Sequence, residues 1–237
     1  MQKNNILIGK VNDLLVKRFG IPARNNNLPD PLDLLIATIL SQNTNDNNSF
    51  KAFQNLKTRF KSWEDVIGIK RSELEKIIKV AGLGKQKSQS IKNLLAGLSE
   101  RGELSLRFIE KLSDEEAIGT LTKFKGVGVK TASCVLLFAL DRNVCPVDTH
   151  VHRTVNRIGI VSERTPDKTF YSLNERFPKN IAHSFHTNLI RLGREVCKPS
   201  KPNCPECPIL KVCAFIDKNL NKVSKSSEKK FMLLDNI

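Results

Sequence analysis

Two titratable residues, Lys130 and Asp148, each follow a turn motif and stand at the expected start of a helix. Lys130 follows the turn Gly126-Val127-Gly128, and the apolar segment behind it predicts a helix that begins near Val129. Two glycines so close can adopt backbone angles that other residues avoid, and they let the backbone approach a ligand. Because the first helical turn also offers N–H groups, this turn is a candidate phosphate site.

Lys130 stands where a positive charge is unexpected, because the helix dipole favours negative charge at an N-terminus. That position, beside an apolar helix, favours the neutral amine of the lysine. A neutral amine is a nucleophile toward sugar carbons and carbonyl carbons. We therefore expect Lys130 to attack a substrate, although an isolated lysine is more often a solvated surface residue.

Asp148 stands in the motif Pro146-Val147-Asp148-Thr149-His150, directly before another expected helix. Its carboxylate suits the N-cap position, where it accepts a hydrogen bond from a backbone N–H of the first turn. A carboxylate here also suits the stabilisation of a cationic sugar or proton exchange with a nearby amine. Capping and catalysis are compatible, so we expect both of Asp148.

Four of the six cysteines form one run with gaps of six, two and five residues: Cys197, Cys204, Cys207 and Cys213. Prolines within the run keep the connecting loop non-helical, so the thiolates can turn inward. Four thiolates so close in an intracellular protein indicate a metal or cluster site and not a set of disulfides. Zinc sites more usually show two C-x-x-C pairs, and this run has one, so it favours a 4Fe–4S cluster.

The composition is that of a basic globular protein. The chain has 237 residues, of which 40% are hydrophobic, enough for one large domain or two small ones. A net charge of +15 is typical of a polyanion binder, although an inert lysine-rich surface gives the same charge. Because the sequence shows neither a bilayer-spanning apolar run nor a signal-peptide pattern, we expect a cytoplasmic protein without a membrane partner.

The segments that must position these residues show helical spacing of apolar side chains. Sustained apolar–polar alternation is absent from the sequence, so we expect an all-α fold. Two S-x-x-E motifs, Ser72 with Glu75 and Ser113 with Glu116, predict capping boxes at helix starts. The expected helices include residues 5–19, 32–40, 72–80, 89–98, 149–158, 167–177 and 181–194.

The sequence G-V-G-V-K at 126–130, followed by P-V-D-T-H at 146–150, resembles the helix-hairpin-helix, Gly/Pro/Asp signature of DNA glycosylases, and of the endonuclease III family in particular. The cysteine spacing, with the preceding R-L-G-R-E-V-C, also resembles the cluster motif of that family and is the most specific signal in the chain. The resemblance covers about Pro31 to Cys213. It implies that Lys130 attacks C1′ of a damaged nucleotide, that Asp148 assists, and that the cysteines hold a mainly structural 4Fe–4S cluster.

The resemblance also implies contacts with double-stranded DNA. Leu83, on a glycine-flanked loop, matches the leucine that wedges into the duplex opposite the flipped base. Asn43 matches the glutamine that fills the space left by that base, and Gln42 is its neighbour, a departure that leaves base preference open. The amides of Gly126, Val127 and Gly128 are expected to hold a backbone phosphate. The remaining candidates, each of which could also be purely structural or solvated, are His150, Lys198 and Lys201.

The implied architecture is two helical domains that flank a DNA-binding cleft. Residues 21–141 are expected to form a six-helix domain with the hairpin, residues 1–20 and 142–217 the cluster domain, and residues 218–237 a basic flexible tail. The expected function is a monomeric, nucleoid-associated DNA glycosylase and abasic-site lyase of base excision repair, with oxidised pyrimidines as the family's usual substrates. The alternatives are a mismatch-type glycosylase, whose members commonly lack the lysine, and a non-catalytic cluster-bearing DNA-binding protein.

Overall fold

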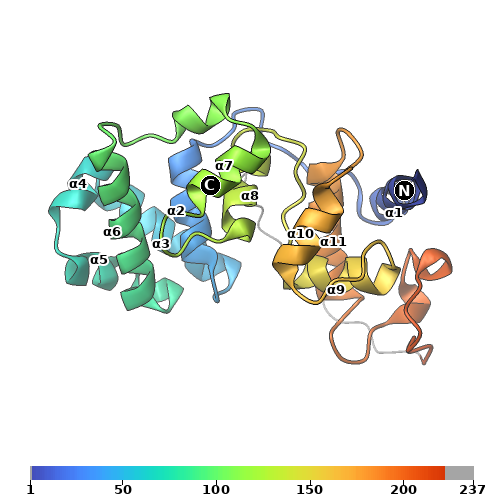
Figure 1. Cartoon of the computed structure of the whole chain (residues 1–237). Helices are drawn as coiled ribbons and strands as arrows, with labels where there is room; N and C mark the ends of the chain where they lie inside the picture. Colours follow the sequence, from blue (N-terminus) through green and yellow to red (C-terminus); the bar gives the residue numbers. More distant parts are fainter. Residues whose placement is uncertain (1, 222–237) are drawn as a thin grey trace. The chain divides into compact units, whose positions relative to one another are not determined.

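A computed structural model describes residues 2–221 of the chain. These residues form eleven α-helices and four short 3-10 helices and contain no β-strand, which confirms the predicted all-α fold (Figure 1). They divide into two compact units, one of residues 25–141 and one of residues 2–24 with 142–221. Most of the predicted basic tail, 218–237, lies outside the described residues. None of the helices among residues 2–221 combines the length and apolar character needed to cross a lipid bilayer.

The unit of residues 25–141 is built around α2, whose side chains are buried on nearly every side. This helix packs against α3, α6 and α8, and α7 packs against α8 (Figure 1). The elements of the unit are α2 (Pro31–Ser41), α3 (Asp46–Arg59), α4 (Trp63–Gly68), α5 (Arg71–Ile78), η1 (Lys79–Ala81), α6 (Gly84–Glu100), η2 (Arg107–Lys111), α7 (Asp114–Leu121) and α8 (Val129–Phe138).

Local capping chemistry sets the two ends of α2. Asp30 is the N-cap, and its Oδ1 accepts from the backbone N–H groups of Leu32 and Asp33 at 2.8 and 3.2 Å. Pro31 occupies the first turn, where its missing N–H costs nothing. The helix ends at Ser41, and Gln42 continues in an extended conformation. The helical conformation therefore stops where the polar segment begins, at Gln42.

The two predicted capping boxes had different outcomes. The box at α7 is confirmed, since Ser113 Oγ accepts from the Glu116 N–H and Glu116 accepts from the Ser113 N–H. The box at Ser72 is wrong, because α5 begins at Arg71 with Lys70 as its N-cap. Glu75 forms an ion pair with Arg71 one turn earlier instead of reaching back to Ser72.

The other unit is organised by α11, which packs against both α1 and α9, while α10 packs against α9. Side chains of α11 fix the end of α1, because Arg191 donates to the Phe19 carbonyl at 2.9 Å and Asn188 donates to the Gly20 carbonyl at 3.0 Å. The elements are α1 (Gln2–Phe19), α9 (Thr149–Ile158), α10 (Pro166–Asn174), α11 (Ala182–Glu195), η3 (Cys204–Glu206) and η4 (Leu210–Val212).

Candidate functional site

The turn before α8 depends on glycine at position 126. Gly126 has a φ of +96°, in the region that favours glycine, and an added Cβ would overlap the Ser90 side chain of α6. Gly128 is extended, with a φ of −96°, and an added Cβ there would meet no described atom within 4 Å. The expected need for unusual backbone angles is thus confirmed for Gly126 only, while Gly128 leaves open space beside the turn.

Lys130 lies in the first turn of α8, directly behind this turn, as the sequence predicted. It is half-buried, and all eight residues that follow it in the helix are buried. The N-cap residue Gly128 has no side chain that could cap the helix, so the first N–H groups of α8 remain available to a ligand from this side. An anion and a lysine can therefore meet at one helix terminus.

Gln42 connects the end of α2 to the same turn. Its Nε2 atom donates to the Gly126 carbonyl at 3.1 Å and to Thr131 Oγ1 at 3.3 Å. Asn43, the residue that matches the family's glutamine, is exposed and has a φ of +51°. The structure thus brings Gln42 together with the turn in front of Lys130. Asn43 instead has an exposed side chain and a left-handed backbone conformation.

Leu83 lies on a second loop of this unit, between η1 and α6. Leu83 is 49% exposed, and its φ of +48° follows a φ of +70° at Gly82. A non-glycine residue in the left-handed region costs about 1–2 kcal/mol. Such cost at an exposed apolar residue fits a role in contacts outside the protein.

Asp148 belongs to the other compact unit. It is the N-cap of α9, where its Oδ1 accepts from the Val151 N–H at 2.7 Å, so the predicted capping role is confirmed. The candidate residues therefore fall into two sets. Gln42, Leu83, the 126–128 turn and Lys130 belong to residues 25–141, and Asp148, His150 and the cysteine run belong to the other unit.

Two residues that the sequence analysis missed hold the segment in front of Asp148. Asn174 of α10 accepts from the Cys145 N–H at 2.7 Å and donates to the Cys145 carbonyl at 3.0 Å. Nδ1 of the buried His186 donates to the Pro146 carbonyl at 2.9 Å. The available signal was the polar type of these residues within otherwise apolar helix faces.

His150 is half-buried in the first turn of α9. Burial lowers the pKa of His150, and the charges of Arg153 and Arg194 act in the same direction, whereas Asp148 opposes them. An Nη atom of Arg153 lies 3.3 Å from His150 Nδ1 and also donates to the Gly193 carbonyl at 2.9 Å. These contacts favour a neutral imidazole that packs α9 against α11.

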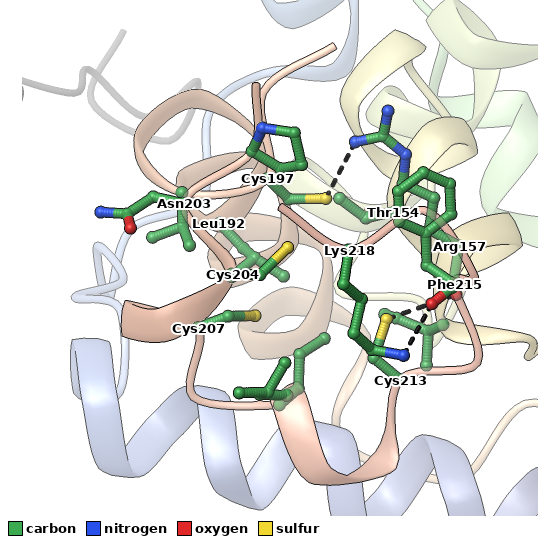
Figure 2. A pocket seen from close by; sticks show the side chains of 15 residues that line it. Thr154, Arg157, Leu192, Cys197, Asn203, Cys204, Cys207, Cys213, Phe215 and Lys218 are labelled. Atoms are coloured by element: carbon green, nitrogen blue, oxygen red, sulfur yellow. Dashed lines mark hydrogen bonds between the residues drawn. The ribbon is translucent and has the colours of Figure 1, made fainter. Parts of the chain in front are cut away.

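The four cysteines of the run line one pocket (Figure 2). Cys197 follows α11, Cys204 begins η3, Cys207 follows η3, and Cys213 follows η4. Arg157 lies beside them, with Nη1 3.4 Å from Cys197 Sγ and its guanidinium 4.4 Å from the centre of the Phe215 ring. The apolar part of the lining includes Leu192, Ile158, Val196 and Ile209.

The four cysteines of this pocket can lose their thiol protons only if a positively charged group binds beside them. Burial is the main cause that raises the pKa of the Cys207 thiol to about 12, and the negative charges of the other three cysteines of the run act in the same direction. Four thiolates can therefore coexist here only with a compensating cation. No group of three or more His, Cys, Asp or Glu side chains within residues 2–221 is arranged to hold a metal ion, so the 4Fe–4S cluster stays a prediction.

Lys198 and Lys201 lie on the loop between Cys197 and Cys204. Lys198 is half-buried, and its carbonyl accepts from Arg157 at 2.8 Å. Lys201 is exposed, with a φ of +49°. Its free position on the loop surface makes Lys201 the better of the two candidates for a phosphate contact.

Comparisons with known proteins place these features in one family. Residues 36–179 match the model of the HhH-GPD superfamily base excision DNA repair proteins. A candidate DNA glycosylase of Arabidopsis thaliana is 40% identical over 73% of this chain, which spans only 59% of that relative. Endonuclease III of Thermotoga maritima is 34% identical over 85% of this chain and 89% of its own length.

Solved structures give the same result. A non-covalent endonuclease III–DNA complex and a trapped endonuclease III–DNA covalent intermediate each superpose with a TM-score of 0.72 at 30% identity. Each comparison covers 88% of this chain, with 94% of the first and 95% of the second. The likeness therefore extends over both compact units.

Proposed function

Because this chain belongs to the HhH-GPD superfamily of base excision DNA repair proteins and is a DNA glycosylase of the endonuclease III type, we propose that it is bifunctional. It excises a damaged base from double-stranded DNA and then cleaves the strand 3′ to the abasic site. We further propose that oxidised pyrimidines are its substrates, in line with the family's usual substrates.

One observation carries the proposal: Lys130 lies in the first turn of α8, directly behind a turn that Gln42 and Gly126 hold in place. The half-buried position of Lys130 at a helix N-terminus, with open space at Gly128, supports a role of this lysine toward a substrate. The trapped covalent complex of an endonuclease III supports a covalent step in a protein of this fold.

In the proposed reaction, the amine nitrogen of Lys130 forms a bond to C1′ while the N-glycosidic bond breaks. The base leaves with the bonding electron pair and takes up a proton. Loss of a proton from the attached nitrogen and opening of the C1′–O4′ bond, with protonation of O4′, give a Schiff base. Removal of a proton from C2′ then expels the 3′ phosphate with the C3′–O electron pair, and water releases the lysine.

Asp148 supports this sequence through its charge. Its carboxylate is anchored by the Val151 N–H through one oxygen. The carboxylate stabilises the positive charge that develops on the sugar, and it accepts and returns the amine proton. The amides of the 126–128 turn bind a backbone phosphate, which places the strand beside Lys130.

Cys197, Cys204, Cys207 and Cys213 are the residues that would hold a 4Fe–4S cluster. When bound, the cluster supplies the positive iron charge that the four thiolates need and fixes the loop that carries Lys201. The predicted division into residues 21–141 and residues 1–20 with 142–217 remains part of this proposal. The boundaries between the two compact units, which follow residues 24 and 141, support this division.

The proposal is tested by comparing strand breaks before and after hot alkali on a duplex that carries one thymine glycol. A bifunctional enzyme gives the same amount of broken strand with and without alkali, because each excision leads to β-elimination. Breaks that form only after alkali would reduce the enzyme to a monofunctional glycosylase. A duplex with an unmodified thymine at the same position is the matched control.

A further inference from the structure

Lys87 is a buried lysine for which the proposed reaction has no use. It lies on α6 with only 2% of its surface exposed, yet its neighbours on the same helix face are apolar: Ile91, Leu94 and Leu98. Its Nζ atom donates to the Leu40 carbonyl at 2.7 Å and to the Ala81 carbonyl at 2.8 Å. A buried ammonium is tolerated only with such partners.

Both carbonyls stand at helix ends. Leu40 lies in the last turn of α2, two residues before Gln42, and Ala81 ends η1, two residues before Leu83. Carbonyl groups in a last helical turn lack intrahelical partners, and the helix dipole is negative there. One ammonium group therefore caps two helix ends at once, and the loops that follow these ends carry the candidate DNA contacts.

Lys87 also holds the Leu83 loop through its main chain. Its backbone N–H donates to the Leu83 carbonyl at 3.0 Å, while its side chain holds Ala81 on the other side of Gly82. Gly82, Leu83 and Asn43 all have positive φ angles. Left-handed positions persist only when surrounding contacts impose them, and the Lys87 side chain supplies such contacts at the two helix ends from which these loops start.

We propose that Lys87 is a positioning residue that holds the Leu83 loop and the Gln42–Asn43 loop at a fixed spacing, so that the two loops enter the duplex together during base flipping. This inference rests on the proposed function. An apolar residue of the same length would bury its surface without the desolvation cost of an ammonium group, so stability alone does not account for a lysine here.

The chain offers a matched control on the same helix. Lys92, also on α6, donates to the Ile67 carbonyl at 2.5 Å and to the Ile69 carbonyl at 2.8 Å, at the end of α4. It thus caps a helix end in the same way, but that end precedes neither of the two loops. Lys92→Met removes an anchor of the same kind at a half-buried position, and its effects measure the loss of stability alone.

The experiment measures single-turnover rates on two duplexes, one with a paired thymine glycol and one with a preformed abasic site, which has no base to unstack. For Lys87→Met, we expect base excision to fall about tenfold and abasic-site cleavage to fall less than about threefold, because unstacking a base costs a few kcal/mol. Lys92→Met keeps the wild-type ratio of the two rates. An unchanged ratio in Lys87→Met, or an equal change in Lys92→Met, would overturn the inference.

A double-mutant cycle of Lys87 and Leu83 separates an effect on base flipping from a general loss of stability. If Lys87 acts through Leu83, Lys87→Met reduces excision much less in a Leu83→Ala background than in the wild type. Additive losses would contradict the inference. Should Lys87→Met fail to fold, Lys87→Gln keeps one donor and enters the same cycle. A wild-type enzyme inactive on both duplexes would instead refute the proposed function.

Discussion

Gln42 donates from its side-chain amide to the Gly126 carbonyl at 3.1 Å, although the two residues lie 84 positions apart in the chain. This bond joins the end of a buried helix to the turn in front of Lys130. Asn43 stands at the position that matches the family's base-filling glutamine, and Gln42 is its neighbour, so the chain combines a base-filling candidate and an anchor for the turn in adjacent residues.

The first prediction separates these two residues. Gln42→Ala removes the anchor of the turn, so we expect a loss of about 1 kcal/mol in the free energy of unfolding and a slower single-turnover excision on every substrate. Asn43→Gly keeps the left-handed backbone and removes only the side chain, so it should alter the preference among damaged bases and opposite bases. Equal substrate profiles for wild type and Asn43→Gly would contradict the base-filling role.

The second prediction compares the two glycines of the turn. Gly126→Ala forces an overlap with Ser90 at a positive φ, so we expect at least about 2 kcal/mol of lost stability in urea unfolding. Gly128→Ala has room for its methyl group and should unfold like the wild type. Its methyl group nevertheless enters the space proposed for the phosphate, so its affinity for abasic DNA should fall. A normal affinity would exclude a phosphate at this turn.

The third prediction concerns the support of Asp148. Asn174→Ala leaves the buried N–H and carbonyl of Cys145 without their partner, which costs about 2–3 kcal/mol. Because the Cys145–Asp148 segment then loses a fixed position, we expect the single-turnover rate to fall while the affinity for DNA is retained. Asn156 of α9 donates to the His152 carbonyl and accepts from the Glu163 N–H of the following loop, away from the Cys145–Asp148 segment, so Asn156→Ala provides a control substitution. An unchanged rate in Asn174→Ala would remove Asn174 from the positioning of Asp148.

The fourth prediction is a pH dependence of stability. Burial lowers the pKa of Lys87 from 10.5 to about 8, so the folded state releases this proton at lower pH than the unfolded state. Between about pH 8 and 10.5 the unfolded chain binds more protons at Lys87, so this group favours the folded state increasingly as pH rises.

Urea unfolding of wild type and Lys87→Met at pH 7.5 and at pH 10 measures this effect. The unfolding free energy of the wild type minus that of Lys87→Met should be larger at pH 10 than at pH 7.5, by up to about 3 kcal/mol. Because both proteins carry the same other lysines, subtracting one unfolding free energy from the other at each pH cancels the titration of those lysines. A difference that stays constant with pH would show that Lys87 titrates alike in both states.

Local sequence signals predicted those parts of the site that depend on neighbours in the chain. The turn, the start of α8 and the capping of α9 by Asp148 follow from short motifs, and the structure confirms them. The anchoring roles of Gln42, Lys87 and Asn174 were missed because each has a partner far along the chain, 84 positions away for Gln42 at Gly126, 47 for Lys87 at Leu40 and 29 for Asn174 at Cys145. The sequence shows only a polar residue near apolar ones, and the fold alone brings the carbonyl partners to it.

The central claim is that Lys130 forms the covalent bond, and borohydride trapping on a duplex with an abasic site tests it most directly. Borohydride reduces a Schiff base to a stable amine, so the wild type should become linked to the strand. Lys125→Ala, a substitution of the exposed lysine directly before the 126–128 turn, should be trapped as well, and Lys130→Ala should bind DNA without being trapped. Trapping of Lys130→Ala at the wild-type level, or DNA binding by the wild type without trapping, would contradict the account.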